Sequence, residues 1–262
     1  MFAERCKKAG EFIHRTVDNV EGIFLLKLRP NTINFGHSQE RQFALDDPYG
    51  RDLGGVGYIQ TFLAGSHREA ASKGLPVAGA PPPLKGYRYV DAIDVADGQR
   101  YRYTGSVQEY ESVASPLVGG NGEKFKRTEF VVSKVPGSSA TPRYGVTYDD
   151  ISTRGEREHW IAGSSLKVID LQTREVIAER VGYMMDRGQG NISGGRSPWL
   201  EAAEHSCPPI ASRPRLLSGP AFAAQTYKTA SFVERVLKPS TSQGEYLLSP
   251  IQRIGSEAAR ER

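Results

Sequence analysis

The chain has 262 residues, of which 38% are hydrophobic and 24% charged, the composition of a globular protein with one large domain or two small ones. No apolar run approaches the roughly 20 residues that a membrane-spanning helix needs, so we expect a soluble protein without a membrane span. The formal net charge is +4, but the segment from Pro208 onward carries 8 Lys and Arg against 4 Asp and Glu, which leaves 26 of each sign before it. The neutral main part has no basic run, which argues against nucleic acid as a partner.

The first twenty residues predict an amphipathic helix. Apolar side chains recur at helical spacing from Phe2 to Val17 with charged residues between them, so the predicted helix covers residues 3–18. The next segment, VEGIFLLKLRP, is predicted to form a buried strand that ends at Pro30. The N-terminus lacks the basic head and apolar stretch of a secretion signal, so an exported form is expected to begin after its signal peptide.

Residues 31–86 are rich in turn-forming residues and predict mostly surface loops. Within them, YIQTFLAG fits either a strand or a short helix. Asp46 and Asp47, directly before Pro48, are typical of a turn in which the side chains cap nearby backbone amides. The same acids are possible calcium ligands, but the ligand alternation of an EF-hand is absent.

Strand patterns dominate the middle of the chain. A hairpin is predicted over residues 87–103, followed by strands over 128–135 and 143–151 and by a long hairpin over 164–185. The segment SPWLEAAEHSC predicts a helix, with its serine as the N-cap and its proline at the first helical position.

The predicted fold class is α+β: a mainly antiparallel β-meander with an N-terminal helix and a short helix near residue 200. Residues 1–207 are predicted to form a single β-rich domain closed by terminal helices. Residues 208–262 are predicted to run extended along that domain, dock on it and fray at the end.

The first hairpin places tyrosines and arginines at alternate positions. Such a pattern occurs where single-stranded nucleic acid stacks on a sheet. It also occurs in a strand that turns tyrosines to the core and arginines to water, and the neutral main part of the chain favours this second interpretation. The residues are Tyr87, Tyr89, Tyr101 and Tyr103, with Arg88, Arg100 and Arg102 between them.

Residues 183–207, YMMDRGQGNISGGRSPWLEAAEHSC, invite enzymatic interpretations. The Gly-Gln-Gly triplet resembles half of a dinucleotide-binding fingerprint, but no helix follows directly and no alternating βαβ pattern surrounds it. Ser193 lies outside the Gly-x-Ser-x-Gly elbow of a serine hydrolase, and the five histidines belong to no catalytic signature. We therefore predict a glycine-rich surface loop over residues 186–196 and no enzymatic activity.

Two cysteines, Cys6 and Cys207, lie near the start and at the end of the neutral part. They fit a pair of reduced buried thiols and a disulfide formed in an oxidising compartment equally well. They form no close-spaced ligand pair, and the histidines are far apart, so no metal and no cofactor is predicted.

From Glu4 to Pro239 the chain resembles a group of small exported bacterial proteins, the immunity partners of type VI secretion lipase (phospholipase) effectors. The resemblance is carried by ERCKKAGEFIHRTVDNVEGIFLLKLRP, FALDDPYGRD, RYGVTYDDIST, EHWIAGSSLKVIDLQTREVIAERVGYMMDRGQGN, PWLEAAEHSCP and FVERVLKP. It implies a periplasmic protein that inhibits its cognate lipase by occluding the active site or lid. It also implies that Cys6 and Cys207 are joined in a disulfide.

An inhibitor of this kind needs preorganised loops that present aromatic and arginine anchors, because such residues carry most of the binding energy at interfaces. Two loops are therefore predicted to bind the lipase. An alternative is an envelope ligand-binding protein, or an enzyme whose site is assembled from dispersed residues. The predicted partner-binding residues are Asp46, Asp47, Tyr49, Arg51 and Asp52 in the first loop and Asp186, Arg187, Gln189 and Asn191 in the second.

Overall fold

The computed structural model describes residues 1–29, 43, 48–50, 54–64, 86–113, 122–137, 140–210 and 224–240. Contacts divide the chain into two units. The first consists of Met1–Gly105 and Val132–Ser242, and the second of Ser106–Val131 and Gln243–Arg262. The candidate site described below lies entirely in the first unit.

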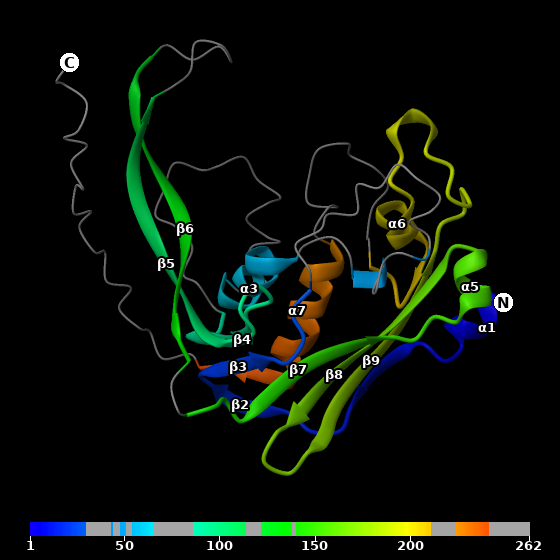
Figure 1. Cartoon of the computed structure of the whole chain (residues 1–262), viewed down its shortest axis with the longest axis horizontal. Helices are drawn as coiled ribbons and strands as arrows, with labels where there is room; N and C mark the ends of the chain where they lie inside the picture. Colours follow the sequence, from blue (N-terminus) through cyan, green and yellow to red (C-terminus); the bar gives the residue numbers. More distant parts are fainter. Residues whose placement is uncertain are drawn as a thin grey trace. The chain divides into compact units, whose positions relative to one another are not determined.

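The main sheet is mostly antiparallel, which confirms the predicted α+β class (Figure 1). Its strands run in the order β1-β9-β8-β7-β3-β4-β5-β6, and β10 also pairs with β9. Their bounds are β1 Gly10–Ile13, β3 Gly22–Leu25, β4 Tyr89–Ile93, β5 Arg100–Val113, β6 Lys124–Pro136, β7 Tyr144–Asp150, β8 Ile161–Asp170, β9 Glu175–Met185 and β10 Ser206–Cys207.

Two antiparallel meanders make up this sheet, and β3 joins them. Strands β7, β8 and β9 pair in sequence order, as do β4 and β5. The strand predicted at VEGIFLLKLRP is β3, and it pairs in parallel with both β4 and β7. An early strand thus lies between strands that come much later in the chain, and the parallel pairing of β3 with β4 requires the long connection from Leu25 to Tyr89.

The predicted helix over residues 3–18 is wrong beyond its first turns. Helix α1 covers only Phe2–Cys6. The chain then forms β1 and a second strand, β2 (Val17–Val20), which pairs in parallel with β11 (Leu237–Pro239). Gly10 weakens a helix at this point, and pairing with β9 satisfies the backbone instead. The apolar spacing therefore did not decide the structure here.

The helices α3 (Gly55–Ala64) and α7 (Ala224–Val236) lie side by side against one face of the sheet (Figure 1). The YIQTFLAG segment is thus helical. Helix α3 contacts β4 and helix α7 contacts β8, and buried aromatic and aliphatic side chains of these helices and of the sheet form the core. Its members include Ile59, Phe62, Phe232, Val233, Val146, Leu166, Val168 and Ala178.

The tyrosines of the first hairpin are partly in the core. Tyr87 and Tyr103 are buried, whereas Tyr89 is half-buried beside the guanidinium of Arg102, whose carbon lies 3.9 Å from the ring centroid. Arg102 also donates two hydrogen bonds, of 2.7 and 3.1 Å, to the fully buried carboxylate of Asp91. The expectation that the arginines point into water is therefore wrong for Arg102, because a buried carboxylate requires a paired cation.

A disulfide joins Cys6 and Cys207, with an S–S distance of 2.06 Å, and so ties α1 to β10. Beside it, Arg5 forms an ion pair with the buried Glu156 of helix α5 (Arg154–Glu158). Thr153 caps α5 in a capping box with the same glutamate. The N-terminal segment is therefore held by a covalent bond and by a partly buried ion pair.

Candidate functional site

Loop 186–196 connects β9 to helix α6 (Pro198–Glu201) and is organised by one buried carboxylate. The side chain of Asp186 is 1% exposed. Its Oδ1 accepts a hydrogen bond of 2.9 Å from the backbone N–H of Gly188, and its Oδ2 accepts one of 2.8 Å from the N–H of Gly190. The carboxylate thus accepts the hydrogen bonds that backbone carbonyls would accept from these amides in a strand or helix. These bonds fix the path of the loop.

Two glycines of the loop lie in close contact with neighbouring side chains. Gly190 has a φ of 78°, and a Cβ there would lie 2.2 Å from the ring of Trp160. A Cβ at Gly188 would lie 2.0 Å from Nη1 of Arg196. In this structure the glycines of the Gly-Gln-Gly triplet therefore allow the loop to pack against Trp160 and Arg196.

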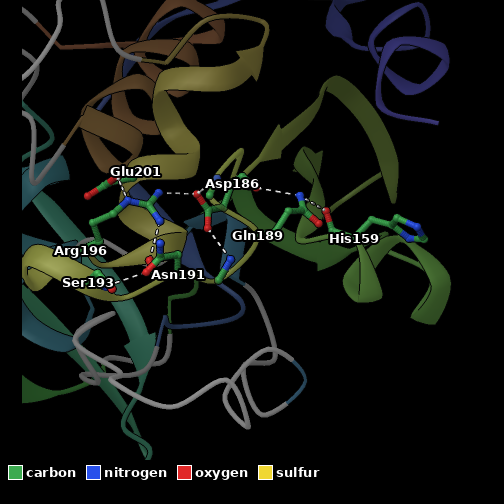
Figure 2. A network of polar contacts seen from close by, with 9 residues as sticks. His159, Asp186, Gln189, Asn191, Ser193, Arg196 and Glu201 are labelled. Atoms are coloured by element: carbon green, nitrogen blue, oxygen red, sulfur yellow. Dashed lines mark hydrogen bonds and ion pairs between the residues drawn. The ribbon is translucent and has the colours of Figure 1, made fainter.

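Arg196 closes the loop from its other end (Figure 2). Its Nη2 donates a hydrogen bond of 2.6 Å to Asp186 Oδ1, its Nε donates one of 2.7 Å to Glu201 Oε2, and its Nη1 donates to the carbonyl oxygen of Asn191. Burial disfavours the charge on Arg196, but the hydrogen bonds from its guanidinium to Asp186 and Glu201 outweigh it and raise its pKa. Charge-assisted bonds of this kind are among the strongest in proteins, so they stabilise this conformation of the loop.

An aromatic cluster supports the loop from the sheet side. The rings of Trp160 and Trp199 lie 4.9 Å apart and are buried with Met184, Ile210 and Tyr49. Trp199 comes from α6 and Trp160 from the segment before β8, so the cluster joins the two ends of the site. Burial of large aromatic side chains stabilises this end of the fold and keeps the loop in place.

Of the four predicted partner-binding residues in this loop, the structure exposes three. Arg187, Gln189 and Asn191 are exposed, whereas Asp186 is buried beneath them. The side-chain amide of Gln189 donates hydrogen bonds to the carbonyl oxygens of His159 and Asp186, at 3.1 and 3.0 Å. The carboxamide oxygen of Asn191 accepts one of 2.8 Å from the N–H of Ser193. The loop therefore presents polar side chains whose positions are partly fixed.

The first predicted loop is seen only in part. Tyr49, in the 3-10 turn η1 (Pro48–Gly50), is 4% exposed and belongs to the aromatic cluster. Its hydroxyl packs over Gly182, where a Cβ would lie 2.0 Å away. Its predicted contact with a partner stays a prediction. The other four residues, Asp46, Asp47, Arg51 and Asp52, lie outside the described residues.

A recess of about 330 Å³ opens beside the loop. Four of its residues were missed by the sequence interpretation, because the spacing of Arg196, Glu201, Glu204 and His205 does not reveal that their side chains meet. The only available signal was Glu201 in the first turn of a predicted helix, where its charge was expected to favour the helix N-terminus. The recess is lined by Asp186, Arg187, Gly188, Asn191, Arg196, Glu201, Glu204 and His205.

In the part of the chain that the structure describes, no three His, Cys, Asp or Glu side chains gather as metal ligands. Among the described helices, none has the length and apolar character needed to cross a membrane. No family model, characterised protein or solved structure matches the chain.

Proposed function

We propose that this protein is an immunity protein that binds and inhibits a cognate type VI secretion lipase effector, and that it has no catalytic activity of its own. The resemblance of the sequence to such proteins supports the proposal. The Cys6–Cys207 disulfide is compatible with the oxidising periplasm, where this inhibition would take place.

The observation that carries the proposal is the contrast within loop 186–196 between an exposed surface and a fixed support. Arg187, Gln189 and Asn191 are exposed, while Asp186 and Arg196 hold the backbone beneath them. A loop that is already ordered loses little conformational entropy on binding, so more of its contact energy appears as affinity. Arginine is also among the residues most often found at the energetic centre of interfaces.

The proposed mechanism is steric. The exposed side chains of loop 186–196 enter or flank the mouth of the lipase active site and block either substrate entry or movement of the lid. A polar loop suits this role because its hydrogen-bonding groups can replace the water that covers the rim of such a site. The inhibitor itself then needs no chemistry beyond shape and hydrogen bonding.

Capture from the native bacterium tests the proposal, with the purified, oxidised protein as bait and mass spectrometry of what it retains. We expect recovery of a secreted lipase whose activity falls when this protein is added. Recovery of no lipase, also at low salt where electrostatic attraction is strongest, would overturn the proposal.

Arg187→Ala is the first variant to measure against the captured lipase. Truncation of a central interface residue costs more than about 1 kcal/mol, so we expect the dissociation constant to rise at least about fivefold. Arg88→Ala is the matched control, because Arg88 is also exposed and pairs with Glu21 on the surface at 2.7 Å. Tyr49→Ala is no clean test, because Tyr49 is buried and its loss would destabilise the fold. Equal affinities for the Arg187 and Arg88 variants would place the interface elsewhere.

The recess favours a second candidate function, the binding of a small ligand in the cell envelope. Its volume of about 330 Å³ lies at the lower end of the range of about 300–1,000 Å³ found for small-molecule sites. Such a protein would be stabilised by its ligand without any protein partner, so a thermal-shift screen of small polar compounds distinguishes the two functions.

A further inference from the structure

We propose that the recess beside loop 186–196 accepts a basic side chain, arginine or lysine, of the protein that this chain binds. This inference rests on the proposed function, because it assumes a protein partner, and it adds the chemistry by which that partner is recognised. The site is formed by the loop, by α6 and by the 3-10 turn η4 (Ala202–His205) that follows it.

The lining residues of the recess favour a polar occupant over an apolar one. Each of its eight residues is charged, polar or glycine. An acyl chain or an aromatic ring would remove water from the exposed carboxylate of Glu204 without replacing its hydrogen bonds, and a buried polar group left without a partner costs about 1–3 kcal/mol. The small volume also limits the occupant to about one side chain or a comparably small molecule.

Charge decides between a cationic and an anionic occupant. The lining contains three carboxylates, of Asp186, Glu201 and Glu204, against the two guanidinium groups of Arg187 and Arg196. Arg196 already donates hydrogen bonds to Asp186, to Glu201 and to the carbonyl of Asn191. The group that Arg196 forms with the two carboxylates carries a net negative charge, which favours a cation over an anion.

Glu204 provides the contact for the incoming cation. Its side chain is exposed, and within the described ranges no residue forms an ion pair or hydrogen bond with its carboxylate. Asp186, 1% exposed, fixes the negative end of the recess with little freedom to move. A guanidinium can bind Glu204 with two parallel hydrogen bonds, while an ammonium binds it as a point charge.

The probe for the experiment is N-acetyl-arginine amide, which carries one guanidinium and no other charge. It is titrated into the isotope-labelled, oxidised full chain, and the side-chain NMR signals of His205 and Asn191, both in the lining, are followed. N-acetyl-glutamate amide is the anionic control. We expect saturable shifts with the cation only, and we expect them to weaken as salt rises.

Glu204→Gln removes the carboxylate and keeps the shape of the side chain. A partly exposed ion pair contributes about 0.2–1 kcal/mol, so we expect the arginine probe to bind roughly 1.5- to 5-fold more weakly. Glu158→Gln is the matched control, because Glu158 is half exposed on α5 and outside the recess lining. Absence of saturable shifts, equal shifts with both probes, or no effect of Glu204→Gln would each overturn the inference.

Binding measurements with the captured lipase distinguish failure of this inference from failure of the proposed function. If Arg187→Ala weakens lipase binding and Glu204→Gln does not, the proposed inhibitor function stands, but the recess does not bind a basic side chain of the lipase. If the arginine probe binds in the recess but no lipase is captured, the proposed function fails and with it the identity of the partner.

Discussion

Asp186 shows how a single buried residue prepares an exposed surface. Both of its carboxylate oxygens are occupied, one by the amide of Gly190 and the other by Gly188 and Arg196. A buried carboxylate is costly unless it is paired and hydrogen-bonded, and here every contact that offsets this cost also fixes loop 186–196. The neighbouring Arg187 can therefore be exposed without making the backbone beneath it mobile.

Two glycines of the loop allow a controlled test of this packing. Gly190 and Gly194 have similar φ values, 78° and 70°, but a Cβ at Gly190 would collide with Trp160, whereas a Cβ at Gly194 meets nothing within 4 Å. Both alanine variants carry the strain of a positive φ, about 1–3 kcal/mol, and only Gly190→Ala adds the steric clash.

We expect Gly190→Ala to lower the free energy of unfolding by at least about 1 kcal/mol more than Gly194→Ala. Urea denaturation monitored by tryptophan fluorescence measures both, since Trp160 and Trp199 lie in the cluster beneath the loop. If both variants lose the same stability, the Trp160 ring can move away from the added methyl group without a loss of free energy. Its packing then does not stabilise the loop.

At the scale of elements, local patterns predicted the strands of the hairpins and failed at the N-terminus. The long hairpin of β8 and β9 was found because its strands pair with each other across a short turn. Strand β1 pairs with β9, which lies far along the chain, and its Glu11 reaches Arg180 of β9 at 3.4 Å and Arg235 of α7 at 2.6 Å. A local stretch of sequence does not reveal such distant partners, and the apolar spacing there favours a helix instead.

One ion cluster joins three of these elements and predicts a pH dependence. The fully buried carboxylate of Asp170, at the end of β8, pairs with Arg143 before β7 and with Arg15 after β1, each at 2.8 Å. The hydrogen bond from Arg143 is the main cause that lowers the pKa of Asp170 to about 2. Because this pKa is lower in the folded chain than in the unfolded chain, the cluster stabilises the fold above about pH 4.

We expect that stabilisation to disappear as the pH falls from about 4 to about 2, where Asp170 takes up a proton in the folded state as well. Unfolding by urea at a series of pH values measures it. The Asp170→Asn variant should be less stable at neutral pH and should lose less stability on acidification than the original chain. An unchanged slope in that variant would show that other carboxylates account for the acid sensitivity.

At the scale of the whole molecule, the disulfide joins two residues that lie far apart in the sequence. Cys6 and Cys207 are separated by 201 positions, so the bridge restricts the unfolded chain strongly. It also anchors β10, which follows directly after Glu204 and His205 of the recess. The stability of the first unit and the shape of the recess are thus linked through one covalent bond.

We expect reduction, or the double variant Cys6→Ser with Cys207→Ser, to lower the free energy of unfolding by up to about 5 kcal/mol, as the chain-entropy model gives for a loop of this length. Chemical denaturation with and without a reductant measures the difference. The double variant serves as the control, because added reductant should leave it unchanged. Equal denaturation midpoints for the oxidised and reduced chains would show that the disulfide adds no stability. The Arg5–Glu156 pair and the pairing of β1 with β9 would then be sufficient to hold the N-terminus.

The sequence by itself determined the α+β class, the hairpins, the start of a helix at Pro198 and the glycine-rich character of loop 186–196, because each depends mainly on residues close in the chain. The predicted extent of that helix is wrong, because the α-helix ends at Glu201 and Ser206–Cys207 pair with β9 as strand β10. Only the tertiary structure decided that Cys6 meets Cys207, that β3 lies between two later hairpins and that Asp186, Arg196 and Glu204 surround one recess. Those arrangements depend on side-chain direction and on pairing between distant segments, and sequence spacing contains neither.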